Sequence, residues 1–416
     1  MAIEIKKVKA RKVYNSRGEE TIEVEVWAGE GYGRAAAPAG KSKGGKEVAY
    51  YPIGGVDESI KLINNELSKK LIGFDASNQE AVDDLLREFD GTEDFRKLGG
   101  NAAFATSLAI ALAAAKALGK SLFEHLRMVD EFRLPYPLGN VIGGGKHAGK
   151  GAPDWQELLV SPIGAGDVYS AVKANFMVHR RAGELLDKHL GGFTLGRGDE
   201  GAYAPPVNTE KGLEILKQAA DDVSDELGFE IRIGVDIAAS SLWDPKKEKY
   251  VYPTEGIELS REDHMNRVAE WTDKFNLFYV EDPLDENDMD GFVELSKQIG
   301  SKTLICGDDL IVTRPEILEE AAEKKAVRAV IIKPNQVGLL TTAMKTIRIA
   351  HEKGIVPTVS HRSGEPPEGT LAQLAVAWGG KLLKAGVVGG ERVAKANELL
   401  RIGEIIGEDK MAVFRI

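Results

Sequence analysis

Five polar side chains stand at the ends of short apolar runs in the second half of the chain. They are Asp236, Glu281, Asp308, Lys333 and His361, and successive members lie 45, 27, 25 and 28 positions apart. An interval of about 25 residues suits one β-strand followed by one helix, and the carboxyl ends of such strands meet at one mouth of a barrel. We therefore expect these side chains to converge on a single site.

Three of these residues are acids that predict a metal site. Asp236, Glu281 and Asp308 would repel one another at a shared mouth unless a divalent cation lay between them. A ligand set of oxygens without cysteine favours Mg²⁺ over Zn²⁺. An aspartate after a strand can instead cap the next helix, but three acids in register favour the metal site.

Basic residues at the following strand ends suggest proton transfer and anion binding. Lys333 closes a run of four apolar residues, and a lysine near a metal and a second lysine is shifted toward its neutral form, so it is a candidate general base. Lys384 lies 23 residues beyond His361, where another strand end is due. Arg362 and Ser363 offer donors for a phosphate or carboxylate.

Two glycine-rich segments carry further candidates. Gly198-Asp-Glu-Gly201 places Glu200 between glycines, and the loop 143–149 holds His147 shortly before Gln156 and Glu157. Each segment suits an exposed turn, yet glycine also lets the backbone approach a ligand closely. The residues alone leave both interpretations open.

The elements that would position these residues follow from the hydrophobic periodicity. Apolar runs are separated by amphipathic segments of helical length, such as 315–326 and 340–353. This pattern predicts a (β/α)₈ barrel, with a doubly wound open sheet as the alternative. The long first interval contains residues 243–252, which we predict to be an extra loop or hairpin. The apolar runs that we predict to be barrel strands are 231–236, 277–281, 304–308, 329–333 and 356–361.

The first third of the chain has a different pattern. Thr21 to Trp27 alternates apolar and polar residues, and 30–33 suits a turn, which predicts an antiparallel meander. Segments 56–72, 77–89 and 101–117 have helical spacing, and two prolines follow at 135 and 137. We predict an N-terminal α+β domain over residues 1–130 and a barrel domain over residues 131–416.

Composition limits the function classes. A chain of 416 residues with 43% hydrophobic side chains suits two globular domains. The net charge of −11 argues against a protein that mainly binds nucleic acid or an anionic membrane, so an anionic ligand needs local positive charge. The single cysteine, Cys306, cannot form an internal disulfide. The N-terminus has no apolar signal region, and the longest mostly apolar run, 102–115, is shorter than the roughly 20 residues of a membrane span. We expect a cytoplasmic protein without a membrane anchor.

Together with the opening segment Val13-Tyr-Asn-Ser-Arg-Gly18, the candidate segments resemble the enolase family, the phosphopyruvate hydratases, along essentially the whole chain. The opening resembles the family's VYDSRG, and the others resemble its active-site blocks in the family's order. This resemblance implies an α+β N-terminal domain packed on a modified (β/α)₈ barrel of the TIM type. The other matching segments are 198–201, 281–283, 307–310, 333–336 and 360–365.

The resemblance also implies a role for each candidate residue. Asp236, Glu281 and Asp308 would hold one Mg²⁺, and Ser42 would help to bind a second, catalytic Mg²⁺. Lys333 would remove the α-proton of 2-phosphoglycerate, and Glu200 would assist departure of hydroxide to give phosphoenolpyruvate, a glycolytic step. The residues implied to contact the substrate are His147, Glu157, His361, Arg362, Ser363 and Lys384. The resemblance further suggests a homo-oligomer, either a dimer or an octamer.

The implied reaction explains why so many charges are needed. A proton α to a carboxylate is weakly acidic because its removal adds a second negative charge to an anion, so cations must stabilise the intermediate. A lysine or histidine base with one or two Mg²⁺ ions is the general scheme of enolase-superfamily sites. Two Mg²⁺ ions and Lys384 would supply that charge here.

This chain departs from the family pattern in the loops around the substrate. Residues 39–44 read Ala-Gly-Lys-Ser-Lys-Gly where the family usually has a sequence like SGASTG, the loop 147–157 is about one residue longer, and residues 363–369 also differ. Ala202 follows Gly201 where a further glycine is common. Two alternatives to an enolase therefore stay open: a paralogue that applies the same Mg²⁺-assisted chemistry to another hydroxy acid, phosphorylated or not, and a noncatalytic binding protein.

Overall fold

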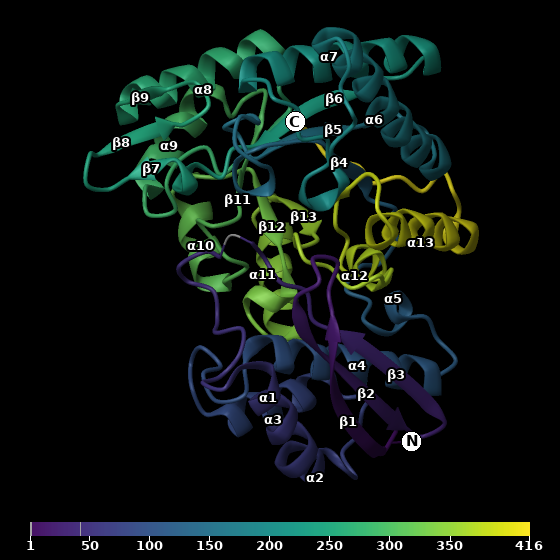
Figure 1. The fold of residues 1–416 in the computed structure, drawn as a ribbon. Helices are drawn as coiled ribbons and strands as arrows, with labels where there is room; N and C mark the ends of the chain where they lie inside the picture. Colours follow the sequence, from purple (N-terminus) through teal and green to yellow (C-terminus); the bar gives the residue numbers. More distant parts are fainter. Residues whose placement is uncertain (1, 42) are drawn as a thin grey trace.

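A computed structural model describes residues 2–41 and 43–416. The N-terminal part forms a three-stranded antiparallel sheet with helices on one side, and the rest forms a closed eight-stranded barrel (Figure 1). The closed barrel excludes the open-sheet alternative.

The predicted meander and helices of the N-terminal part are confirmed. β1 (Ile5–Tyr14), β2 (Glu20–Ala28) and β3 (Gly31–Ala36) pair in that order, and the turn between the last two is limited to residues 29 and 30 because β3 already begins at Gly31. Valines of β2 are buried while its glutamates are partly exposed, as the alternation requires. The helices are α1 (Gly55–Leu62), a π-helical turn η1 (Ile63–Leu67), α2 (Ser68–Leu71), α3 (Gln79–Asp90), α4 (Gly100–Ala117) and α5 (Leu122–His125).

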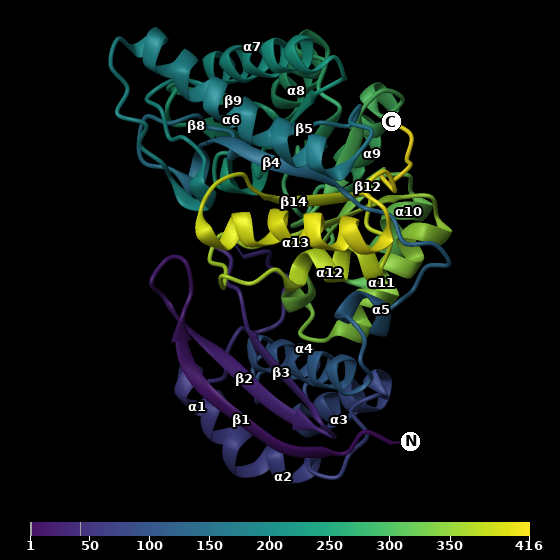
Figure 2. The ribbon, with the colours of Figure 1, turned by 90° about the vertical axis from the view of Figure 1, so that its right-hand side faces the viewer.

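The α4 helix packs closely against the sheet (Figure 2). A Cβ atom on Gly33 would lie 2.1 Å from the carbonyl oxygen of Ala109, and one on Gly31 would lie equally close to that of Ala113. Only glycine allows this approach between strand and helix. Among the described residues, α4 is the one helix long and apolar enough to cross a membrane, and 83% of it is buried inside the protein, as in a core helix.

The barrel strands follow the order β10-β11-β12-β13-β14-β4-β5-β6. All five runs predicted as strands are strands, and each ends at or just before its predicted polar residue. The barrel strands are β4 (Tyr136–Gly143), β5 (Glu157–Ser161), β6 (Arg232–Asp236), β10 (Tyr279–Glu281), β11 (Leu304–Gly307), β12 (Ala329–Ile332), β13 (Val356–Ser360) and β14 (Leu382–Gly386). The covering helices are α6 (Val168–Leu190), α7 (Thr209–Leu227), α8 (Arg261–Phe275), α9 (Met289–Ile299), α10 (Pro315–Glu323), α11 (Leu340–Glu352), α12 (Thr370–Ala377) and α13 (Gly390–Ile406).

One strand breaks the parallel pattern. β5 runs antiparallel to both β4 and β6, so the first residue of β5, Glu157, pairs in register with the last residue of β6, Asp236. The chain between β4 and β5 contains a short 3₁₀ turn, η2 (Gly145–His147). It contains no helix that would return the chain to the end of the barrel where β4 begins. As a result Glu157 lies at the mouth although it begins a strand.

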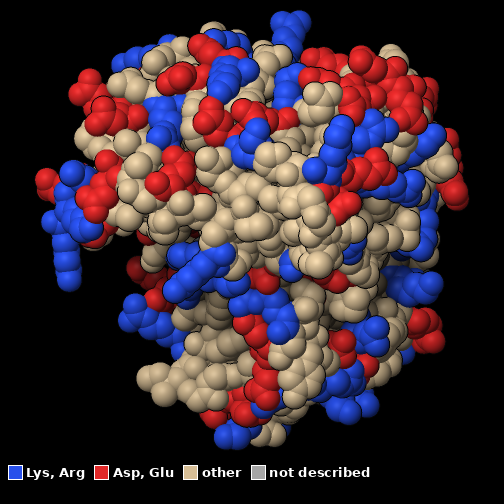
Figure 3. All heavy atoms as spheres, turned by 45° about the horizontal axis from the view of Figure 1, so that its top comes forward, with Lys and Arg blue, Asp and Glu red and all other residues tan. Residues whose placement is uncertain are grey.

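The predicted insertion is also confirmed. β7 (Trp243–Asp244), β8 (Lys249–Tyr252) and β9 (Ile257–Leu259) form a separate antiparallel sheet after β6. On the face shown in Figure 3, acidic and basic side chains of the described residues are interspersed rather than gathered into one basic band.

The contact between β3 and α4 gives a stability prediction. Gly33→Val should lower the free energy of unfolding by about 1–3 kcal/mol or more, because the added side chain must displace the α4 backbone. Arg34→Val, on the exposed face of the same strand, should change it by less than about 1 kcal/mol. Urea denaturation followed by circular dichroism measures both, and equal midpoints would contradict the packing argument.

Candidate active site

The strand-end residues surround a cleft with about 420 Å³ of empty space at the mouth of the barrel. Gly40 and Lys41 of the N-terminal part complete its wall. Of the residues predicted for the site, Glu281 lies beneath the cleft, where it contacts Lys384, and Ser42 lies outside the described residues. The cleft brings together the others: His147, Glu157, Glu200, Asp236, Asp308, Lys333, His361, Arg362, Ser363 and Lys384.

Lys384 on β14 lies among three of the acids. Its Nζ atom is 2.7 Å from Glu281 Oε1, 3.0 Å from Asp236 Oδ2 and 3.4 Å from Glu157 Oε2. Burial would lower the pKa of Lys384, but these carboxylates raise it well above its usual value. Lys384 is therefore a fixed positive charge at the centre of the acids.

The crowding of these acids changes the pKa of Glu281. It is fully buried, and the Tyr279 hydroxyl donates a hydrogen bond of 2.7 Å to its Oε2. Burial and the neighbouring Asp236 raise the pKa of Glu281 to about 8. The acids thus exceed the positive charge that Lys384 alone supplies.

Lys333, just after β12, pairs with Asp308, just after β11. The Gln336 amide donates a hydrogen bond of 3.0 Å to the other oxygen of Asp308. Burial would lower the pKa of Lys333, but Asp308 holds it above the usual lysine value. In this arrangement Lys333 carries a proton, and its basicity depends on the charge state of Asp308.

Two more acids of the mouth were missed from the sequence. Asp282 accepts hydrogen bonds from the backbone of Asp308 at 2.9 Å and of Asp309 at 2.7 Å. Burial and the neighbouring Asp308 raise the pKa of Asp309 to about 8. Both residues adjoin predicted ligands in the Glu281-Asp-Pro283 and Gly307-Asp-Asp-Leu310 segments, so the second acid of each pair was a usable signal.

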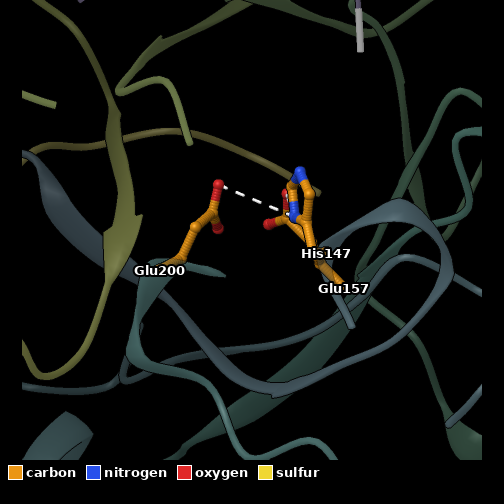
Figure 4. Close-up of side chains that lie close together, drawn as sticks. All are labelled: His147, Glu157 and Glu200. Carbon is orange, nitrogen blue, oxygen red and sulfur yellow. Dashed lines mark ion pairs between the residues drawn. The ribbon is translucent and has the colours of Figure 1, made fainter. Parts of the chain in front are cut away.

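His147, Glu157 and Glu200 lie close together and face one another in the cleft (Figure 4). His147 Nδ1 lies 3.5 Å from Glu157 Oε1 and 3.7 Å from Glu200 Oε1. Both glycine-rich segments therefore belong to the site, which decides the alternatives that the sequence left open.

The two glutamates of this group differ in their proton affinity. Burial and the charge of Glu200 raise the pKa of Glu157 well above its usual value. Burial would raise the pKa of Glu200 as well, but the adjacent His361 and His147 bring it well below the usual value. Of the two carboxylates, Glu157 therefore has the higher affinity for a proton.

Glycines hold Glu200 in place. Glu200 has a φ of 68°, a backbone conformation that non-glycine residues rarely adopt. A Cβ atom on Gly201 would lie 2.0 Å from the Val388 carbonyl oxygen, and one on Gly386 would lie 1.9 Å from that of Glu200. The Asn140 amide donates a hydrogen bond of 3.0 Å to Glu200 Oε2. The segment is thus pressed into the barrel rather than exposed as a turn.

His361 and Arg392 meet behind Glu200. His361 Nε2 lies 3.3 Å from Glu200 Oε2, and burial lowers the pKa of His361 to about 4, so the ring is neutral near pH 7. On its other side, Arg392 of α13 donates to His361 Nδ1 at 2.5 Å. Arg392 was missed from the sequence because it follows no strand, and only the fold brings it to the site.

Arg362 links the barrel to the N-terminal part through hydrogen bonds. Its guanidinium forms two bonds of 3.0 Å to the Glu47 carboxylate and donates to the Tyr50 hydroxyl at 2.7 Å. The Ser363 hydroxyl accepts hydrogen bonds from the backbone of Lys41 at 2.8 Å and from Arg17 at 3.1 Å. The two predicted anion donors thus also hold the N-terminal loop over the cleft.

The lysines of that loop have different environments. Lys41 Nζ lies 3.3 Å from Asp199, the neighbour of Glu200, while Lys43 Nζ lies 4.6 Å from the centre of the Tyr50 ring. Lys41 lines the cleft, so a substrate there would meet its charge.

The charge balance of the cleft suits a divalent cation. Six acidic side chains line it against four basic ones, and one of the basic ones, Arg362, is paired with Glu47. The donors are carboxylate oxygens, which suit Mg²⁺. Among the described residues, Asp282, Asp308 and Asp309 place ligand atoms within 4.8 Å of one another, as do His147, Glu157 and Glu200. The residues present therefore fit a bound cation.

Comparison with known proteins identifies the family of the chain. The enolase C-terminal TIM barrel domain matches residues 131–414, and the enolase N-terminal domain matches residues 5–126. An enolase of Methanothermobacter thermautotrophicus is 48% identical over 408 residues, which are 98% of each chain. Enolases of Archaeoglobus fulgidus and Thermoplasma acidophilum are 46% and 41% identical, each over 98% of this chain and 99% and 100% of their own. The chain therefore belongs to the enolase family, the phosphopyruvate hydratases.

Proposed function

We propose that this chain catalyses the reversible dehydration of 2-phosphoglycerate to phosphoenolpyruvate by Mg²⁺-assisted removal of the α-proton. The observation that carries the proposal is the cleft itself, which combines a strand-end lysine, two glutamates of unequal proton affinity, and an excess of carboxylates. The substrate is a small anion, for which Lys41, Lys384 and Ser363 line the cleft.

Lys333 is the proposed base, because its side chain lines the cleft and its proton affinity depends on the neighbouring Asp308. While Asp308 pairs with it, Lys333 stays protonated. It becomes a base once another cation neutralises Asp308, because the carboxylate then no longer stabilises the ammonium form.

Glu200 is the proposed acid for the leaving hydroxide. It must first receive a proton, and Glu157, which lies near the same His147 nitrogen, is the neighbouring carboxylate with the raised pKa. Asn140 and His361 keep the Glu200 carboxylate in one position for the transfer.

Asp236, Glu281 and Asp308 would hold Mg²⁺, with Ser42 as the proposed contact to a second ion. When bound, Mg²⁺ supplies positive charge that stabilises the dianionic intermediate. Lys384 adds a permanent charge between the same acids, so part of that stabilisation is built into the chain.

A paralogue acting on another hydroxy acid is the second candidate, and the altered loop favours it. Lys41 adds a cation to the cleft wall at a loop where the family usually has small and hydroxyl side chains. Purified protein with Mg²⁺ and 2-phosphoglycerate, followed by the ultraviolet absorbance of the enol product, separates the candidates. Turnover supports the enolase reaction; Mg²⁺ binding without turnover supports the paralogue.

Replacing Lys333 tests the base. Lys333→Ala should abolish exchange of the substrate α-proton with solvent, because no other proposed group accepts it, while Mg²⁺ binding is retained. Exchange is followed by proton NMR in deuterium oxide. Lys324→Ala, on the surface and paired with Glu320, should exchange at the original rate. Undiminished exchange in Lys333→Ala would move the base role to another residue.

The raised pKa of Glu281 predicts pH-dependent metal binding. A ligand carboxylate must lose its proton before it binds Mg²⁺, so affinity should rise as pH increases toward 8 and level off above it. The rise should be about ten-fold per pH unit if one proton is displaced. Isothermal titration with Mg²⁺ alone measures it.

Glu368→Gln provides the control, because burial raises the pKa of Glu368 to about 7 but its side chain does not line the cleft. This variant should keep the pH slope, whereas Glu281→Gln should bind weakly and without the slope. A pH-independent affinity in the unaltered protein would contradict the prediction.

The loop lysines give a separate prediction. Lys41→Ala should raise KM or lower kcat about ten-fold or more, because a charge-assisted contact contributes about 1.5–3 kcal/mol. Lys43→Ala should have a smaller effect, since its ammonium lies over the Tyr50 ring. Lys46→Ala, exposed in the same segment, is the matched control. Steady-state kinetics equal to those of the unaltered protein for Lys41→Ala would show that the altered loop does not contact the substrate.

A further inference from the structure

We infer that Arg392 is a positioning residue that fixes the tautomer of His361, with the ring proton on the Nε2 atom that lies beside Glu200. The inference rests on the proposed function for its kinetic consequence, whereas the state of the ring can be measured without any substrate.

Arg392 is buried in an unusual place for a cation. It is 1% exposed and lies in the first turn of α13, where the helix dipole disfavours positive charge. Burying a guanidinium is costly unless its N–H groups find acceptors. A neighbouring carboxylate, Glu391, lies 3.3 Å from its Nε atom.

Three acceptors of Arg392 belong to consecutive residues of the site. Its guanidinium donates to His361 Nδ1 at 2.5 Å, to the Arg362 carbonyl at 2.8 Å and to the Ser363 carbonyl at 2.6 Å. The two carbonyl bonds alone would suffice to hold the backbone after β13. The third bond, to the ring nitrogen, has a different consequence.

The chemistry of arginine determines which nitrogen of His361 carries the proton. A guanidinium only donates hydrogen bonds, so the Nδ1 atom that it contacts must be the unprotonated acceptor. A neutral ring then carries its proton on Nε2, which lies 3.3 Å from Glu200 Oε2. Arg392 thereby presents an N–H group to the carboxylate proposed as the acid.

Charge supports the same arrangement. The groups that face His361 are Glu200 from the turn η3 (Asp199–Gly201), Glu365 from its own loop and Arg392 from α13. The two glutamates favour a protonated ring, whereas burial and Arg392 oppose it. Without Arg392, Nδ1 would lose the donor that now occupies it and would be free to carry a proton.

Nitrogen-15 NMR of the full-length protein tests the inference. The chain has seven histidines, and the signals of His361 are those lost in His361→Gln. In the unaltered protein near pH 7, His361 should show a protonated Nε2 and an unprotonated Nδ1. Arg392→Met should give the doubly protonated ring or move the proton to Nδ1.

Two further variants separate positioning from a structural role. Arg392→Lys keeps the positive charge and should keep the ring neutral, although it cannot make all three bonds. Arg401→Met, a substitution of an exposed arginine on the same helix, should leave the His361 signals and the activity unchanged. On 2-phosphoglycerate, Arg392→Met should lower kcat by roughly 10- to 100-fold, as for loss of a residue that orients a catalytic group.

A protonated Nδ1 in the unaltered protein would overturn the inference without any variant, even if Arg392→Met fails to fold. An unchanged His361 spectrum in Arg392→Met, together with reduced activity, would also overturn the inference. Arg392 would then only support the backbone after β13. If the unaltered protein does not turn over 2-phosphoglycerate, the proposed function fails and the NMR result still decides the role of Arg392.

Discussion

The barrel mouth depends on the burial of Lys384 among carboxylates. Burying these acids side by side in charged form would be too costly without the lysine. Burying the charged lysine would be too costly without the acids. Together, Lys384, Glu281, Asp236 and Glu157 offset most of one another's desolvation. The balance is incomplete, because Glu281 still has a pKa of about 8.

The antiparallel strand β5 makes this cluster possible. If β5 ran parallel to its neighbours, Glu157 would stand at the bottom of the barrel, far from Lys384 and from His147. The reversal brings the first residue of β5 beside the last residue of β6 and places an acid where the neighbouring strands end. One exception to the parallel pattern therefore supplies both a partner for Lys384 and the member of the Glu157 and Glu200 pair that has the raised pKa.

The N-terminal part contributes contacts that the barrel cannot make alone. Glu47 neutralises the buried Arg362, and the backbone of Lys41 donates to the Ser363 hydroxyl. These bonds hold Lys41 of the altered loop, and Glu47 after it, against strand-end residues that line the cleft. Changes of sequence in that loop therefore alter the cleft directly, while the acids and lysines of the barrel stay as they are.

The sequence by itself determined the barrel strands, the N-terminal meander and the convergence of the strand-end residues, because hydrophobic periodicity and a regular interval specify local elements and their common edge. The resemblance added His147, Glu157 and Glu200, whose segments suit exposed turns when considered alone. Only the tertiary structure placed Arg392, Asp282 and Glu47 at the site, and only it paired Lys333 with Asp308 and Lys384 with Glu281. The physical reason is that these contacts join residues far apart in the chain, and their protonation depends on burial and neighbouring charge, which no local pattern of residues records.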